Sequence, residues 1–229
     1  MTIENLIQIY ETKKQKYGEQ AYKYISEIFD EAKQIHKEFA LQRGIIDTEQ
    51  SWRAFKGKNL EKLIEYIIVD SVRNLGLEII NGNKLEKSKN LPKNLEIIKR
   101  NLCVDYGEFG MHLPDVDMVI FEPKKCKIIA VLSSKVTLRE RIAQTGYWKL
   151  KLLESTLTKH IKVFFITLDE DETLSFARPA KKGRAICEVD TDGCYILSNA
   201  HFESSNKVKL FCDFLDDFEK DFVRLGRHK

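Results

Sequence analysis

Two aspartates and a lysine in the middle of the chain have the residue types and spacing of a phosphodiester-cleaving site. Asp115 and Asp117 stand at the start of the apolar run VDMVIF (116–121), and Lys135 directly follows the next apolar run, KIIAVLSS (127–134). Two such runs joined by a short turn predict a β-hairpin, which brings the acids and the lysine together. A divalent cation held by carboxylates neutralises charge on a phosphate and activates a water, which a lysine can orient. Because Mg²⁺ prefers oxygen ligands and keeps several waters, it is the expected cofactor.

This segment resembles the sequence motif of the PD-(D/E)XK nuclease superfamily. Pro114-Asp115 matches the first half of the motif, and Ser133-Ser134-Lys135 stands where the second half is expected. The superfamily normally carries an acid two residues before the lysine, so Ser133 is a departure. A subgroup of restriction enzymes, including those that cut sites containing CCGG, also has a non-acid there and supplies the missing carboxylate from a helix. The resemblance, which covers about residues 51–170, implies a type II restriction endonuclease.

Four carboxylates are candidate metal ligands under this resemblance. Asp117 alternates with the apolar residues of its strand, and similar enzymes place the acid directly before such a run, so Asp117 is favoured over Asp115. The replacement carboxylate is assigned to Glu61, because SWRAFKGKNLEKLIEY resembles the helix that precedes the sheet in this superfamily. Glu154 is the alternative, because CCGG-type enzymes take their acid from the helix after the lysine. The expected catalytic residues are Asp117, Lys135, Glu61 and Ser133.

A charged cluster after the lysine has the chemistry to recognise DNA bases. Similar enzymes show a (S/T)-x-R-(D/E)-R pattern there, whose Arg-acid-Arg part contacts base edges in the major groove, and this chain carries TLRER at 137–141. Arginine reaches O6 and N7 of guanine, and glutamate accepts from N4 of cytosine, so a site with G·C pairs is expected. An ordinary exposed charge cluster is the alternative interpretation. The expected DNA-binding residues are Thr137, Arg139, Glu140 and Arg141.

Apolar periodicity predicts the elements that position these residues. Helical spacing covers the first 45 residues and recurs at about 51–75, 138–156 and 208–225. The polar segment 81–94 is expected to be a surface loop. Strands are expected at 77–80, 116–121, 127–134, 161–169, 185–189 and 194–197.

The order of these elements predicts an α/β fold of the restriction-endonuclease-like kind. Such a fold has a central mixed β-sheet flanked by helices, here with an N-terminal helical portion. We expect residues 1–48 to form a helical region packed on the core, and residues 49–229 to form the catalytic and DNA-recognition domain.

Composition sets broader limits on the class of protein. The chain has 229 residues, of which 43% are hydrophobic and 32% charged, as in globular proteins. Its net charge is only +3, so any contact with nucleic acid must come from local clusters of charge. The five cysteines form no CxxC pair, which favours reduced thiols. The N-terminus lacks the pattern of a signal peptide, and no apolar run is long enough to span a membrane, so a cytoplasmic protein is expected.

The expected function is site-specific cleavage of double-stranded DNA. Because the chain holds little beyond a catalytic core, a homodimer with one active site per strand is expected, and its two-fold symmetry would match a palindromic site. Two alternatives remain open. One is a structure-specific or repair nuclease of the same superfamily. The other is a DNA-binding protein that has lost its metal site, which Ser133 keeps in consideration.

Overall fold

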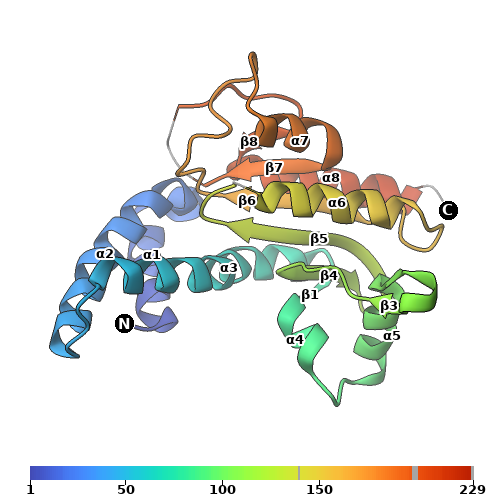
Figure 1. The fold of residues 1–229 in the computed structure, drawn as a ribbon, viewed down its shortest axis with the longest axis horizontal. Coiled ribbons are helices and arrows are strands. Elements are labelled where there is room, and N and C mark those ends of the chain that lie inside the picture. The colour runs from blue at the N-terminus through green and yellow to red at the C-terminus, as the bar shows by residue number, and fades with distance from the viewer. Residues whose placement is uncertain (139, 198–200, 228–229) are drawn as a thin grey trace.

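A six-stranded mixed β-sheet forms the centre of the computed structural model, which describes residues 1–138, 140–197 and 201–227 (Figure 1). The strands lie in the order β1-β4-β5-β6-β7-β8. The first three pair antiparallel and the last four pair parallel, so β5 joins the two halves. The predicted mixed sheet is confirmed. The strands are β1 (Glu78–Asn81), β4 (Met118–Glu122), β5 (Lys127–Lys135), β6 (Lys162–Thr167), β7 (Gly193–Ile196) and β8 (Val208–Leu210).

The hairpin that carries the candidate chemistry forms as predicted. β4 and β5 pair antiparallel with Met118 opposite Leu132, which brings the start of β4 beside the end of β5. β5 and β6 are buried along almost their whole length. Helices cover both faces of these strands, which explains why their sequences are continuously apolar instead of alternating.

Helices α3 and α6 lie on opposite sides of β5 (Figure 1). On the α3 side, one hydrophobic cluster joins Leu6, Ile28 and Leu60 of the first helices to Leu132 and Phe164 of the sheet. The predicted boundary at residue 48 falls on the first residue of α3, and the division into two parts stays a prediction. The elements of this side are α1 (Ile3–Tyr17), the 3₁₀ helix η1 (Gly18–Tyr24), α2 (Ile25–Gln42), α3 (Thr48–Asn74) and α8 (Cys212–Arg227).

The long helix α3 has clear start and stop signals. The Asp47 side chain accepts a hydrogen bond from the backbone N–H of Gln50 at 2.9 Å and so caps the first turn of α3. Gly76 follows its last turn with a φ of 74°, which is costly for residues with a side chain. The predicted stop at Gly76 is confirmed, and the helix begins three residues before the expected Ser51.

The opposite side of the sheet carries shorter helices. Ile98 and Leu152 pack with Val131 and Val163 in a second hydrophobic cluster, and Ile142 packs with other residues in a third. A small hairpin of β2 (Val104–Asp105) and β3 (Met111–His112), joined through the 3₁₀ helix η2 (Gly107–Phe109), lies outside the main sheet. The helices are α4 (Gly82–Lys87), α5 (Lys93–Leu102), α6 (Arg141–Leu153) and α7 (Lys182–Asp190).

Three sequence predictions of secondary structure are wrong. The expected strand at 185–189 lies within helix α7, where Arg184 and Cys187 are the buried residues, at helical spacing. A five-residue apolar run does not distinguish a strand from one turn of buried helix. The expected loop at 81–94 contains α4 and the start of α5, because Asn81 caps α4 and Leu85 is buried. The last helix was expected from residue 208, but Val208–Leu210 form strand β8, and α8 begins at Cys212.

Within the described residues, no helix has both the length and the apolar character needed to cross a membrane.

Candidate active site

Asp117 and Lys135 meet at the point where β4 begins and β5 ends. Asp117 is 6% exposed, and the Lys135 Nζ lies 2.9 and 2.8 Å from its two carboxylate oxygens. One of these oxygens also accepts the Ser134 backbone N–H at 2.6 Å. The Asp117 N–H in turn donates to the Leu132 carbonyl at 3.0 Å. The hairpin therefore fixes both the backbone and the carboxylate of Asp117 beside the lysine.

Glu61 brings a second carboxyl group to this point from helix α3. Its side chain lies close enough to Asp117 and Asn81 for both to influence its pKa. Burial, followed by the negative charge of Asp117, raises the pKa of the Glu61 carboxyl, and the positive charge of Lys135 opposes this rise. Two carboxyl groups and one ammonium group therefore converge from three segments of the chain.

The junction between β1 and α4 supports the start of β4. The Gly82 N–H donates to the Asp117 carbonyl at 2.8 Å. A Cβ at Gly82 would lie 1.8 Å from the Val116 carbonyl oxygen, so any side chain there would displace the backbone next to Asp117. Sequence reasoning missed this role. The adjacent Asn81-Gly82 pair, which favours tight turns, was the available signal.

The other candidate acids lie elsewhere. Asp115 is exposed, and its carboxylate accepts a hydrogen bond from the Gln144 amide of α6 at 2.9 Å. Glu154 follows the last residue of α6, is 60% exposed and pairs with Lys151 at 2.9 Å. Neither has a described bond to Asp117 or Lys135.

Ser133 occupies the position where the superfamily motif has an acid. It is 6% exposed and pairs with Phe165 of β6 in the parallel half of the sheet. Because side chains alternate along a strand, Ser133 and Lys135 share one face of β5. The buried position gives a carboxylate little access to solvent, and Glu61 supplies the second carboxyl group from α3.

An open cleft of 570 Å³ adjoins the Asp117–Lys135 pair. Two predicted DNA-binding residues, Thr137 and Arg141, line it together with Lys135. Glu140 is exposed at the N-cap of α6, and Arg139 lies outside the described residues. The cleft is lined by Arg53, Lys56, Gly57, Lys135, Val136, Thr137, Arg141, Glu170 and Asp171.

Comparison with known proteins identifies the family. The family model for BsaWI restriction endonuclease type 2 matches residues 94–221, more than half of the chain. The chain belongs to this family. It is a type II restriction endonuclease of the PD-(D/E)XK type, as the sequence motif predicted.

Two relatives agree with this assignment. The chain is 34% identical over 223 residues to MjaVIP of Methanocaldococcus jannaschii, named as a type II restriction enzyme, with 95% of this chain and 93% of that protein covered. It is 42% identical over 120 residues to HpyAORF263P of Helicobacter pylori, also named as a type II restriction enzyme. That match covers 52% of this chain and 61% of the relative.

A solved structure confirms the fold. The restriction endonuclease PspGI, determined in complex with its substrate DNA, superposes with a TM-score of 0.53 at 16% identity, covering 96% of this chain and 93% of PspGI. The restriction-endonuclease-like α/β fold is therefore confirmed, with its N-terminal helices included in the compared length.

The part of this restriction endonuclease that matches the family model contains most of the candidate site. Asp117, Ser133, Lys135 and Arg141 lie inside residues 94–221. Glu61 lies before that segment, so its assignment depends on its contact with Asp117 in the structure.

An acidic turn after β6 supports the segment that follows Lys135. The Glu170 N–H donates to the Val136 carbonyl at 3.3 Å, and Glu170 also forms an ion pair with Lys56 of α3. Asp171 accepts the Leu138 N–H at 3.2 Å. Sequence reasoning missed this turn, because the partners are far apart in the chain.

Asp169 holds this turn from inside. Its carboxylate is 4% exposed and accepts the N–H groups of Thr173 and Leu174 at 2.9 and 3.0 Å. Burial raises the pKa of Asp169 to about 6, although these two hydrogen bonds act in the opposite direction. Asp169 therefore stabilises the turn that lies beside the cleft.

The carboxyl groups of Asp117 and Glu61 fit a hard divalent cation. Both offer oxygen donors, and a cation between them would relieve the repulsion that contributes to the raised pKa of Glu61. Among the described residues, no group of three or more histidine, cysteine, aspartate or glutamate side chains is placed to hold a metal. Two carboxylates suit Mg²⁺, which usually keeps several waters and takes few protein ligands.

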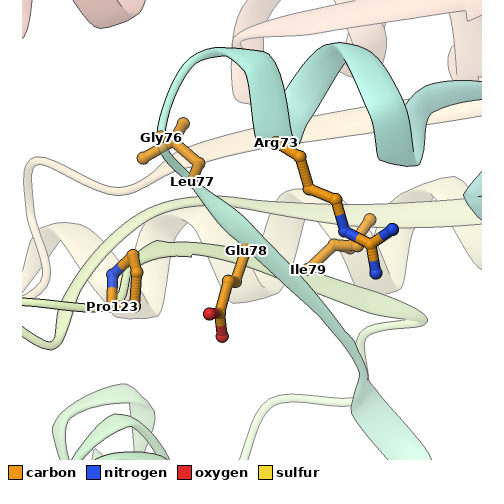
Figure 2. A pocket seen from close by; sticks show the side chains of 6 residues that line it. All are labelled: Arg73, Gly76, Leu77, Glu78, Ile79 and Pro123. Atoms are coloured by element: carbon orange, nitrogen blue, oxygen red, sulfur yellow. The ribbon is translucent and has the colours of Figure 1, made fainter.

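A second cavity, of 590 Å³, lies at the other end of α3 and beside the sheet edge (Figure 2). Arg73 of α3, Glu78 and Ile79 of β1, and Pro123 are among the residues that line it. None of the candidate catalytic residues lines this cavity. Arg73 is exposed there, at the opposite end of α3 from Arg53, which lines the active-site cleft.

Proposed function

We propose that this restriction endonuclease hydrolyses both strands of double-stranded DNA with a divalent metal, Mg²⁺, at a palindromic site containing G·C pairs. The observation that supports this most strongly is the convergence of Asp117, Glu61 and Lys135. Lys135 Nζ is 2.8 Å from Asp117, and Glu61 lies near enough to the same carboxylate for the charge of Asp117 to raise its pKa. This donor set has the chemistry required for phosphodiester hydrolysis.

Asp117 and Glu61 would hold the metal, with Asp117 as its principal ligand, because Asp115 is exposed and bonded to Gln144 of α6. The bound metal supplies neutralisation of phosphate charge and a more acidic water. Asp117 is held in place by the Ser134 N–H, at 2.6 Å, and by the β4–β5 pairing. Glu61 supplies the carboxylate that the motif position occupied by Ser133 does not.

Lys135 acts on the substrate side of this pair. Its ammonium group faces the cleft and is only partly buried, so it can contact a phosphate oxygen while remaining near Asp117. We assign it to holding the scissile phosphate and orienting the attacking water. In this superfamily, the products carry 5′-phosphate and 3′-hydroxyl ends.

Base recognition is assigned to Thr137, Arg139, Glu140 and Arg141. Thr137 and Arg141 line the cleft next to Lys135, and Glu140 is exposed beside them. Arginine and glutamate side chains can pair with the edges of guanine and cytosine in the major groove. Recognition next to the cleavage residues would fix the distance between the site and the cut.

We further propose a homodimer formed through α6 and the small hairpin. Exposed apolar side chains gather on these elements, and a hydrogen bond of 2.8 Å between the Tyr106 and Tyr147 hydroxyls links the two. Contiguous exposed apolar surface commonly marks an interface. Because α6 begins at Arg141 in the cleft, a two-fold contact along α6 would bring two clefts to one DNA duplex. The apolar residues are Phe109, Met111, Tyr147, Leu150 and Leu153.

Digestion of fully sequenced phage DNA tests the proposed function. We expect discrete fragments with Mg²⁺ and none with EDTA, and mapping of the ends should give a palindrome containing G·C pairs. Cleavage of branched DNA alone would indicate a structure-specific nuclease. Binding without cleavage on several unmethylated DNAs would indicate a protein that has lost its metal site.

A further inference from the structure

A glycine stands inside helix α3 at a position where the fold does not require one. Gly57 belongs to a helix that runs from Thr48 to Asn74. A Cβ built on Gly57 meets no atom within 4 Å, and its φ lies outside the left-handed region. Glycine in a helix interior costs about 1 kcal/mol relative to alanine. Packing and backbone geometry within the chain therefore leave this glycine unexplained.

Gly57 lies on the same helix face as two residues with relevant chemistry. Arg53 precedes it by four positions and Glu61 follows it by four, so all three side-chain positions are neighbours on one face of α3. Arg53 and Gly57 line the cleft that contains Lys135, and Glu61 contacts Asp117. At 1.5 Å of rise per residue, Arg53 and Glu61 are about 12 Å apart along the helix axis.

The charges around this face favour a polyanion. Arg53 and Arg141 are exposed, and neither side chain has an ion pair or hydrogen bond to another described residue. The acids of the cleft are engaged: Glu170 pairs with Lys56, and Asp171 accepts the Leu138 N–H. Two arginines therefore remain available for a ligand.

We infer that the Arg53–Gly57–Glu61 face of α3 is the track along which the backbone of the cleaved DNA strand lies. Arg53 binds a phosphate near the scissile one, and Gly57 keeps the helix surface clear so that the sugar–phosphate backbone can approach. This inference rests on the proposed function, because the Glu61 end of the track is the metal site. Arginine suits this role because its guanidinium group binds phosphate with two parallel hydrogen bonds.

The charge at Arg53 is tested by the salt dependence of DNA binding. The probe is a short fluorescein-labelled duplex of random sequence, measured by anisotropy in EDTA, because non-specific binding depends on phosphate contacts. Losing one phosphate contact should make the negative slope of log K against log salt shallower by about 0.9 and weaken binding about eight-fold at 0.1 M salt. We expect this for Arg53→Ala.

Arg73→Ala is the matched control for this charge. Arg73 is also exposed and also lies on α3, but at the end beside the other cavity (Figure 2). We expect its slope to equal that of the wild type. Equal slopes for Arg53→Ala and Arg73→Ala would overturn the inference.

Gly57→Ala tests the close approach of the backbone. Because the new methyl group has room in the free protein, we expect a Tm about 2–4 °C higher than that of the wild type. The same methyl group should weaken binding of the duplex several-fold, since it lies where the DNA backbone would pass. A raised Tm with unchanged binding would overturn the track.

Failure of the proposed function gives a different result. A wild-type protein that binds the duplex but cuts no DNA with Mg²⁺ would contradict the nuclease proposal, while the slopes of the two arginine variants would still decide the track. A wild-type protein that cuts phage DNA at discrete sites but does not bind the duplex would overturn the track alone.

Discussion

At the scale of single residues, two aspartates separated by one position have different surroundings. Asp117 is 6% exposed and is held by Ser134 and Lys135, whereas Asp115 is exposed and bonded to Gln144 of α6. The sequence favoured Asp117, because it alternates with the apolar residues of its strand and similar enzymes place the acid directly before such a run. The assignment of the metal ligands stays a prediction, and the geometry supports Asp117 over Asp115.

Separate substitution of Glu61 and Glu154 by glutamine tests which of them supplies the second carboxylate. Glu61→Gln removes a charged oxygen donor beside Asp117 and should lower the rate of Mg²⁺-dependent cleavage by at least about a hundredfold, the scale of a lost catalytic group. Glu154→Gln makes the same chemical change at a 60% exposed helix end and should leave the rate unchanged. Single-turnover cleavage of a mapped site gives both rates. Loss of activity in Glu154→Gln alone would reverse the assignment.

Arg141 gives a residue-scale test of base recognition. It lines the cleft beside Lys135 without a described partner, so its removal should affect DNA more than folding. Arg141→Ala should cost about 1–3 kcal/mol of discrimination at one G·C position. Cleavage rates on the mapped site and on its single-base variants measure this. A uniform loss over all sequences would assign Arg141 to phosphate binding.

At the scale of elements, periodicity predicted the long helix and the strands of the site. α3, β4, β5 and β6 all carry strong patterns, and the turn between β4 and β5 is short enough to fix their pairing. The errors fall where a short segment is decided by distant contacts. The Lys56–Glu170 pair and the contact of Gly82 with Val116 join segments that no local pattern relates.

Two glycine-to-alanine changes should have opposite effects on stability. At Gly82 the new Cβ would lie 1.8 Å from the Val116 carbonyl, so Gly82→Ala should destabilise the fold by about 1–3 kcal/mol, as overpacking does. It should also reduce cleavage, because the displaced backbone carries Asp117. Gly57→Ala has open space and is the stabilising counterpart. Thermal denaturation compares them, and a Gly82→Ala variant as stable as the wild type would refute the proposed role of this junction.

At the scale of the whole molecule, the mixed sheet and its helices form the arrangement that positions the active-site cleft. From the chain length we expected a homodimer, in which each copy would cut one strand. The sequence does not predict which surface would join two copies, because apolar residues of α6 have the same helical spacing whether they face the core or solvent. The structure shows which of them are exposed: Leu150 is 51% exposed and Leu153 is 47% exposed.

A charge on this surface tests the homodimer. Leu150→Glu should halve the mass measured by sedimentation, because a glutamate would be buried without a partner at the interface. Val189→Glu, at a 74% exposed position on α7, is the matched control, and this variant should still sediment with the mass of a dimer. A wild-type protein that sediments as a monomer, or a Leu150→Glu variant that remains a dimer, would contradict this interface.

The most direct test of the central claim is the effect of Lys135→Ala on Mg²⁺-dependent DNA cleavage. Lys159→Ala, an exposed lysine beyond the end of α6, is the control. We predict that Lys135→Ala keeps DNA binding but loses cleavage by at least about a hundredfold, while Lys159→Ala cuts at the wild-type rate. Cleavage by Lys135→Ala at the wild-type rate would contradict the assignment of the active site to Asp117, Glu61 and Lys135.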